Sequence, residues 1–161
     1  MKKIAYDDSR IHYCGRMEKD PECEGYRWVF AASSALIRFQ GSSLRVEISV
    51  KREGWDVFLG VIVDGIQSKL EVKEGRSEIV LAEGLDPDRI HEVLFFKRMD
   101  TMNIITIMSF QVDDDAVVFD ANKSRSILAS ELGIRSGRRI EFFGDSVSCG
   151  EVSEAVLYTG K

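Results

Sequence analysis

The chain has 161 residues, of which 44% are hydrophobic and 30% are charged, and its formal net charge is −5 at pH 7. This length supports one sizeable hydrophobic core and a little more, and the composition is typical of a globular protein. An acidic chain without a basic stripe argues against nucleic acid as the main partner. The longest nearly apolar run, residues 57–63, is too short to span a bilayer, so we also expect no membrane partner.

The first eight residues contain two lysines but no apolar stretch behind them, so they do not read as a signal peptide. We therefore expect a protein that is either cytoplasmic or secreted with its leader already removed. Cys14, Cys23 and Cys149 lack the paired spacing of a zinc site, and two histidines do not complete one. We expect no metal and no cofactor. A Cys14–Cys23 disulfide is one alternative, and reduced, partly buried thiols are the favoured one.

Residues 11 to about 118 carry an almost pure strand signal. Apolar runs bounded by turn residues predict strands at 10–16, 26–30, 35–39, 43–50, 57–63, 70–72, 78–81, 90–98 and 104–112. Residues 43–50 alternate cleanly between apolar and polar, which predicts one dry and one wet face. Residues 57–63 are continuously apolar, as expected of a strand covered on both faces.

The turns support the same interpretation. Asp64–Gly65 lies between two apolar runs and predicts a two-residue hairpin, because both positions must reach positive φ. A polar loop is expected at 17–25. Short strands at regular spacing, without a convincing amphipathic helix, predict a mainly β protein, a β-sandwich whose eight or more strands suit a jelly roll. Residues 124–132 are ambiguous between helix and loop, and residues 136–139 resemble a linker.

A serine block follows the linker. Ile140–Phe143 predicts a short strand, which Gly144, Asp145 and Ser146 break at once. A small residue before a nucleophile lets the backbone turn without a Cβ clash, which would present the Ser146 hydroxyl at the carboxyl end of a strand. The first N–H groups of a following helix would favour negative charge there, as an acyl-transfer site requires.

Residues 139–150, Arg-Ile-Glu-Phe-Phe-Gly-Asp-Ser-Val-Ser-Cys-Gly, resemble the first conserved block of the SGNH (GDSL-type) hydrolases. More narrowly, they are similar to the version in carbohydrate esterase family two, the acetylxylan-esterase-like enzymes. Further loose matches occur in the same order as in that family, at residues 14–16, 26–28, 39–42, 61–65 and 91–98. Together with the serine block they cover about Gly15 to Gly150.

The resemblance implies an N-terminal jelly roll at 1–136 and the first strand and turn of a truncated α/β SGNH hydrolase domain at 137–161. It implies a serine carbohydrate esterase that removes acetyl groups from plant polysaccharide such as acetylated xylan or glucomannan. Ser146 would be the nucleophile and its backbone N–H an oxyanion donor, with Gly144 and Asp145 supporting the turn. The histidine base, its acid and the other oxyanion donors belong to later blocks, so this chain alone is expected to be inactive.

Two other functions stay open for the sandwich. It is a carbohydrate-binding module if Trp28, Trp55, Tyr13 and Tyr26 form an exposed platform for sugar rings, although core packing of these rings is favoured. Alternatively, it is a structural domain that packs against the missing C-terminal SGNH domain. The strand at 140–143, without its sheet neighbours, is expected to be disordered, to pack back on the sandwich or to pair with another chain. His12 and His91 match no catalytic histidine, and His91 is expected to be a hydrogen-bonded structural residue.

Overall fold

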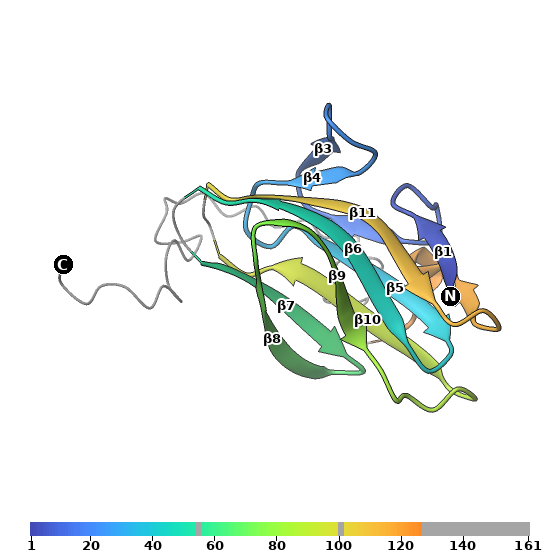
Figure 1. Cartoon of the computed structure of the whole chain (residues 1–161). Helices are drawn as coiled ribbons and strands as arrows, with labels where there is room; N and C mark the ends of the chain where they lie inside the picture. Colours follow the sequence, from blue (N-terminus) through green and yellow to red (C-terminus); the bar gives the residue numbers. More distant parts are fainter. Residues whose placement is uncertain (54–55, 100–101, 127–161) are drawn as a thin grey trace.

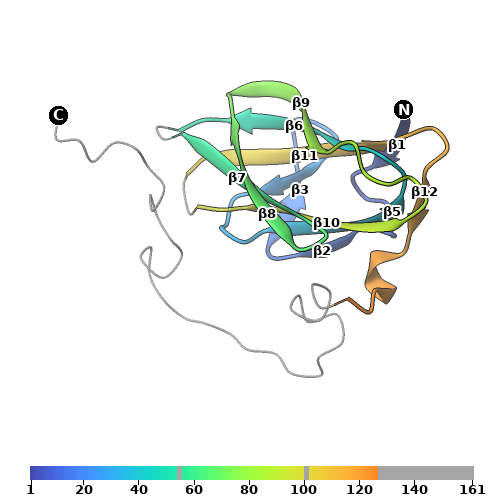
Figure 2. The same ribbon diagram turned by 90° about the horizontal axis from the view of Figure 1, so that it is seen from below.

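Two antiparallel β-sheets of six strands each form a sandwich, in a computed structural model that describes residues 1–53, 56–99 and 102–126 (Figures 1 and 2). Sheet A contains β1 (Lys2–Ala5), β3 (Met17–Lys19), β4 (Tyr26–Trp28), β6 (Leu44–Lys51), β9 (Gly75–Ala82) and β11 (Ile104–Val112). Sheet B contains β2 (His12–Cys14), β5 (Ser34–Gln40), β7 (Val57–Val63), β8 (Ile66–Val72), β10 (Ile90–Lys97) and β12 (Val117–Phe119). A short 3₁₀-helix, η1 (Ala121–Lys123), follows β12.

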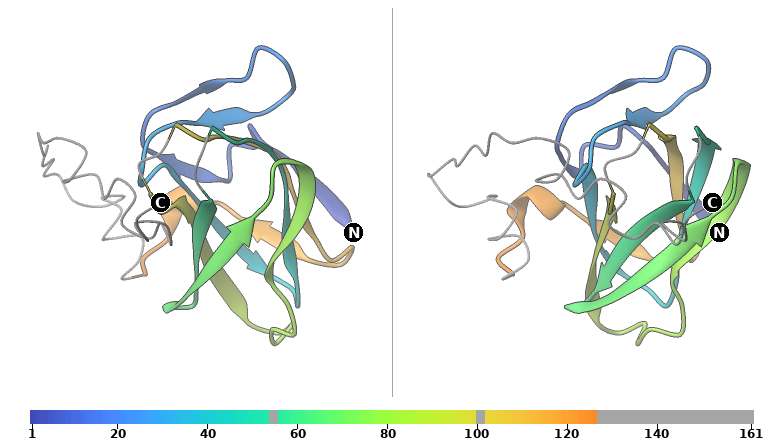
Figure 3. Two further views of the ribbon diagram at one scale, coloured as in Figure 1. Left: turned by 60° about the vertical axis from the view of Figure 1, so that its left-hand side comes forward. Right: turned by 90° about the vertical axis from the view of Figure 1, so that its left-hand side faces the viewer.

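Each sheet is organised around one strand that pairs with three others. In sheet A, β11 pairs with β6 along one edge, while β4 and β1 share its other edge end to end. In sheet B, β5 pairs with β10 along one edge, while β2 and β12 share the other. The hairpin loop between β3 and β4 projects beyond the rest of sheet A (Figure 3).

The hydrophobic core lies between the sheets and follows from the strand period. Strand β6 buries every second residue, as the alternation in its sequence predicts. The largest buried rings are Trp28, Phe39, Phe95 and Phe110, and Trp28 packs against Phe95 at a centroid distance of 5.5 Å. Burying one such side chain stabilises the fold by about 1.5–3 kcal/mol, so these rings form the most stabilising part of the sandwich.

Two turns hold the strands in register. Asp64 and Gly65 have φ angles of 50° and 91°, which confirms the predicted two-residue hairpin between β7 and β8. The turn between β5 and β6 is fixed by Asp113, at the end of β11. Its carboxylate accepts hydrogen bonds from the backbone N–H and the hydroxyl of both Ser42 and Ser43, at 2.5–3.0 Å. This turn therefore ties a sheet B strand to two sheet A strands.

Some strands differ from the sequence prediction because their side chains face water. Strands β8 and β9 reach from 66 to 72 and from 75 to 82, so the turn between them is shorter than predicted. Most residues of β8 are exposed, and exposed strands carry no alternation. Strand β3 lies inside the predicted polar loop, where pairing with β4 orders it. Within the described residues no helix is both long and apolar enough to cross a membrane.

The described residues contain the all-β sandwich and no part of an α/β hydrolase domain. The predicted boundary at Ser136 and the predicted strand at 140–143 lie outside the described residues.

Candidate functional site

The predicted nucleophile block lies outside the described residues. Ser146, Gly144 and Asp145 all fall in the undescribed range 127–161, so their roles remain predictions from the sequence. Cys149 falls in the same range. The described residues form the sandwich, and they include its two outer faces and both histidines.

The predicted aromatic platform does not form among the described residues. Trp28 is fully buried in the core, as the favoured interpretation held. Tyr26 lies between Tyr6 and Tyr13, with edge-to-face centroid distances of 5.0 and 5.1 Å. The hydroxyl of Tyr13 donates to the backbone oxygen of Tyr6 at 2.6 Å, and burial raises the pKa of this phenol. Trp55 lies outside the described residues.

His91 is a structural residue, as predicted. Its side chain is 3% exposed, with Nδ1 2.6 Å from an Asp64 carboxylate oxygen and Nε2 2.8 Å from the backbone oxygen of Asp86. A carbonyl oxygen only accepts, so Nε2 carries a proton, and Nδ1 faces an acceptor as well. Burial opposes the charged ring, but these two partners outweigh burial and raise the pKa of His91. The two acceptors thus favour the protonated ring, and the His91 side chain joins the β7–β8 turn to the loop before β10.

His12 is also engaged within the sandwich. Its Nδ1 lies 2.7 Å from Oδ1 of Asn122, in η1. Cys14 and Cys23 are both free thiols, so the alternative of a Cys14–Cys23 disulfide is wrong and the favoured one is confirmed. Among the residues that the structure describes, no group of three or more His, Cys, Asp or Glu side chains could hold a metal ion.

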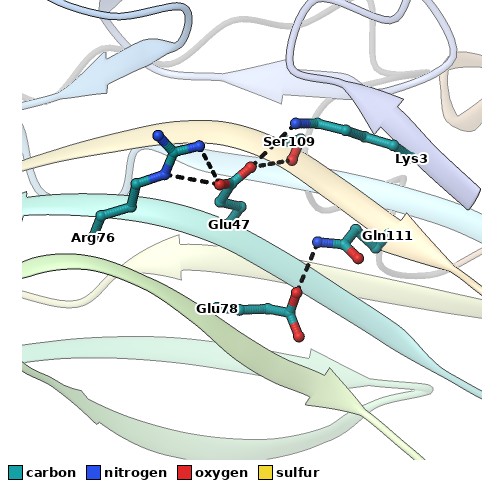
Figure 4. A network of polar contacts seen from close by, with 6 residues as sticks. All are labelled: Lys3, Glu47, Arg76, Glu78, Ser109 and Gln111. Carbon is teal, nitrogen blue, oxygen red and sulfur yellow. Dashed lines mark hydrogen bonds and ion pairs between the residues drawn. The ribbon is translucent and has the colours of Figure 1, made fainter. Parts of the chain in front are cut away.

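The outer face of sheet A is polar, and its side chains form a network of two neighbouring clusters of hydrogen bonds and ion pairs (Figure 4). Glu47 on β6 is the hub: one carboxylate oxygen accepts two hydrogen bonds from Arg76, at 2.5 and 2.8 Å. The other accepts from Ser109 at 3.0 Å and from Lys3 at 3.3 Å. Arg76 foremost, with the hydroxyl and the lysine, holds the pKa of Glu47 below its usual range although burial opposes the shift.

A second carboxylate on the same face links three of the same strands, β9, β6 and β11. Glu78 on β9 accepts from Arg45 at 2.9 Å and from Gln111 at 2.8 Å. The network therefore crosses β9, β6, β11 and β1, and every member lies on the water-facing side of sheet A. The sequence signal for it is the polar half of the alternation in residues 43–50, but the partners of these residues are 29–62 positions away.

A groove of about 470 Å³ opens beside the network and is lined by Lys3, Tyr6, Cys23, Glu47, Arg76 and Met108, among others. A smaller hollow of about 160 Å³ adjoins it at Cys23. In that hollow Asp20 accepts from Thr106 at 2.5 Å and from Arg27 at 3.2 Å. Burial works against ionisation of Asp20, but these hydrogen bonds outweigh it and lower the pKa.

The groove offers the chemistry of hydroxyl recognition rather than of catalysis. Charged planar groups such as those of Glu47 and Arg76 hydrogen-bond neighbouring hydroxyls in pairs, and Tyr6 and Met108 supply apolar surface. No histidine from the described part of the chain lines it, and Arg76 foremost lowers the pKa of its Glu47 carboxylate.

Residues 13–121 match the protein family described as Carbohydrate esterase 2 N-terminal. The match spans more than half of the chain, so the chain belongs to this family and the sandwich is its N-terminal domain. This confirms the resemblance found in the sequence. A search among curated proteins gave no match.

Solved structures with the same fold include family two carbohydrate esterases. The enzyme from Clostridium thermocellum, solved in complex with cellohexaose, is 23% identical with a TM-score of 0.58, and the match covers 68% of this chain and 32% of that one. The enzyme from Cellvibrio japonicus is 16% identical with a TM-score of 0.60, covering 73% and 33%. This chain thus spans about one third of the esterases it matches.

The fold also occurs as an independent module. The carbohydrate-binding module CBM36, solved in complex with calcium and xylotriose, is 11% identical with a TM-score of 0.54. The match covers 70% of this chain and all of the module. At this identity the likeness concerns the fold alone.

Proposed function

We propose that this chain is the accessory sandwich and nucleophile block of a serine carbohydrate esterase. One observation carries the proposal: a sandwich that belongs to the esterase family is followed, in the same chain, by Gly144–Asp145–Ser146 in the family's sequence context. The substrate is an acetylated plant polysaccharide such as xylan or glucomannan. The sandwich would be a jelly roll over residues 1–136, and the hydrolase domain would begin at residue 137.

In this proposal the Ser146 hydroxyl attacks the acetyl carbonyl and forms an acetyl-enzyme, which water then hydrolyses. The Ser146 backbone N–H donates to the developing oxyanion. The chain has two histidines, and both are engaged within the sandwich, so the base that takes the serine proton comes from residues beyond Lys161. Losing a single oxyanion donor typically costs on the order of 10²–10³ in rate, so this chain alone should be nearly inactive.

The test compares this chain with the protein encoded by the reading frame extended beyond Lys161, on an acetyl ester and on acetylated xylan. We expect the extended protein to exceed the 161-residue chain by at least about 10³-fold, and Ser146→Ala to remove that difference. Ser148→Ala is the matched control, a neighbouring hydroxyl whose loss should leave the rate within about twofold. Equal rates for the two chains, or an active Ser146→Ala variant, would contradict the proposal.

A second function, glycan binding by the sandwich itself, is favoured by the groove on sheet A. Affinity electrophoresis on xylan and glucomannan should then show retardation of this chain. Arg76→Ala, which opens the network without touching the core, should weaken the retardation several-fold. Arg52→Ala is the control, because its carboxylate partner Asp56 lies off the groove. No retardation on either polysaccharide would remove this function.

A further inference from the structure

The outer face of sheet B is apolar along its central strands, unlike that of sheet A. The register pairs Leu36 on β5 with Leu94 on β10, and Leu94 with Ile62 on β7, so the three form one row across the sheet. In the next row Phe96 pairs with Gly60. Leu36, Leu94 and Ala121 of η1 are buried together in a hydrophobic cluster of their own, and Ile62 and Phe96, which pack against it, are only half-buried.

Gly60 shapes this surface. A Cβ at Gly60 would lie only 2.2 Å from the tip of the Phe96 ring, so the ring lies across the strand at a position that only glycine permits. The result is a flat aromatic surface on the outside of the sheet. An antiparallel sheet that faces water normally alternates with polar residues there, so this face has the pattern of a sheet covered on both sides.

Charged side chains border the apolar rows. The Lys69 ammonium lies 4.4 Å from the centroid of the Phe58 ring, and the Arg38 guanidinium lies 5.6 Å from that of Phe119. An apolar centre with a polar rim is the usual anatomy of a protein interface. Among the described residues every strand belongs to one of the two sheets, so η1 is the only element available to cover this face.

The chain leaves the sandwich over the same face. η1 lies on the side of sheet B away from sheet A (Figure 2). Beyond it, the Ser124 hydroxyl donates to the Glu92 carboxylate on β10, which also pairs with Arg38 at 3.5 Å. These contacts anchor the exit point beside the apolar rows. A tethered segment starting here has an effective concentration in the millimolar range, far above that of a second copy in dilute solution.

We propose that the outer face of sheet B is the docking surface for the continuation of this same chain, beginning with the 35 residues from 127 to 161 (161 − 126 = 35). This rests on the proposed function, since the continuation is then the hydrolase domain. Its first predicted strand, Ile140–Phe143, supplies apolar side chains for burial. The sandwich thereby acts as the platform on which the nucleophile block is positioned.

Photo-crosslinking of the 161-residue chain tests the proposal, with p-benzoylphenylalanine placed at one position at a time. Ile62 is the test position. Val80 is the matched control, because it is also β-branched and half-buried but faces outward beside Arg45 on sheet A. At low micromolar concentration we expect crosslinks from position 62 to peptides within 127–161, in a band of monomer mass, at least tenfold above those from position 80.

Crosslinks from position 62 in a band of twice the monomer mass would assign this face to a second copy and overturn the proposal. Equal yields from positions 62 and 80 would overturn it as well. Near-ultraviolet circular dichroism confirms that both variants keep the native core. The crosslinking test and the esterase test can fail separately. If position 62 crosslinks to residues 127–161 but the Ser146→Ala variant of the extended protein is still active, only the proposed reaction is wrong. If that variant is inactive but position 62 gives no crosslinks, only the docking proposal is wrong.

Discussion

The two outer faces of the sandwich differ in polarity. The outer side of sheet A carries charged and amide groups, which Glu47 holds in one cluster and Glu78 in another. The outer side of sheet B carries leucine, isoleucine and phenylalanine along its middle strands, where Leu36 and Leu94 are buried and Ile62 and Phe96 are half-buried. The difference is visible in the burial patterns of single strands. In β6, buried residues alternate strictly with less buried ones, whereas β10 is buried at most positions on both of its sides. The burial pattern of a strand therefore reports what covers the outside of its sheet as well as the core.

The largest effect should come from separating the two sheets at the turn they share. Asp113→Ala removes the acceptor of four hydrogen bonds from Ser42 and Ser43 and leaves these half-buried donors without that partner. We expect a loss of about 3 kcal/mol in the free energy of unfolding, measured by urea titration. Asp114→Ala is the control, since this exposed carboxylate pairs with the amino group of Met1, and its effect should be much smaller. Equal effects would show that the shared turn does not join the sheets.

On the apolar face, Gly60→Ala forces the Phe96 ring off the sheet. Overpacking of this kind costs about 2 kcal/mol in the free energy of unfolding. The double variant Gly60→Ala/Phe96→Ala removes the ring that clashes, so its cost should be clearly less than the sum of the two single costs. Strict additivity in this double-mutant cycle would show that the ring does not rest on Gly60.

On the polar face, Glu47→Gln keeps the shape of the hub and removes its charge. Because the side chain is 17% exposed and solvent screens the ion pairs with Arg76 and Lys3, we expect a loss of only about 1 kcal/mol. That loss should shrink in 1 M salt, where the Debye length falls to about 3 Å. A salt-independent loss would instead indicate that the hydrogen bond from Ser109 dominates.

The smallest effect concerns pH. His91 has a raised pKa in the folded chain, so its stabilisation is complete below the ordinary histidine value of about 6.5 and is lost as pH rises through the raised value. Asp64 and the Asp86 carbonyl favour the charged ring, and the nearby Arg89 opposes it. His91→Gln should therefore flatten the decline in unfolding free energy that begins as pH rises past about 6.5, by less than about 1 kcal/mol. Parallel pH profiles for parent and variant would contradict this. The pKa values of Asp113 and Glu47 are lowered in the folded chain, so the stabilisation from these two carboxylates is lost as pH falls into the acid range.

The sequence predicted the parts of the fold that local patterns determine. The alternation at 43–50 became β6, and Asp64–Gly65 became a hairpin turn. Strand β1 was missed because three of its four residues face water and only Ile4 is buried, which leaves no alternation to detect. The length of β8 was missed for the same reason. Such strands form because a neighbouring strand pairs with them, and the residues of one segment alone do not predict that pairing.

The candidate sites also differ in whether a local sequence pattern predicts them. The serine block is a contiguous motif, and it was found from its own residues. The network around Glu47 joins residues from four strands, and the Asp113 carboxylate reaches serines 70 and 71 positions away, so neither has a local signature. For Trp28 the sequence favoured the core but left a binding platform open, because an aromatic residue suits both, and the packing against Phe95 confirms the core position.

The pairing of β1 with residues 109–112 has a consequence for synthesis on the ribosome. Strand β1 completes an edge of β11, which follows it by about 110 positions, so sheet A cannot close until that whole stretch has been translated. At 5–20 residues per second this takes roughly 6–22 s, during which the amino-terminal strand has no lasting partner. A bulky fusion at Met1 would therefore interfere with the final closing step more than with the early hairpins.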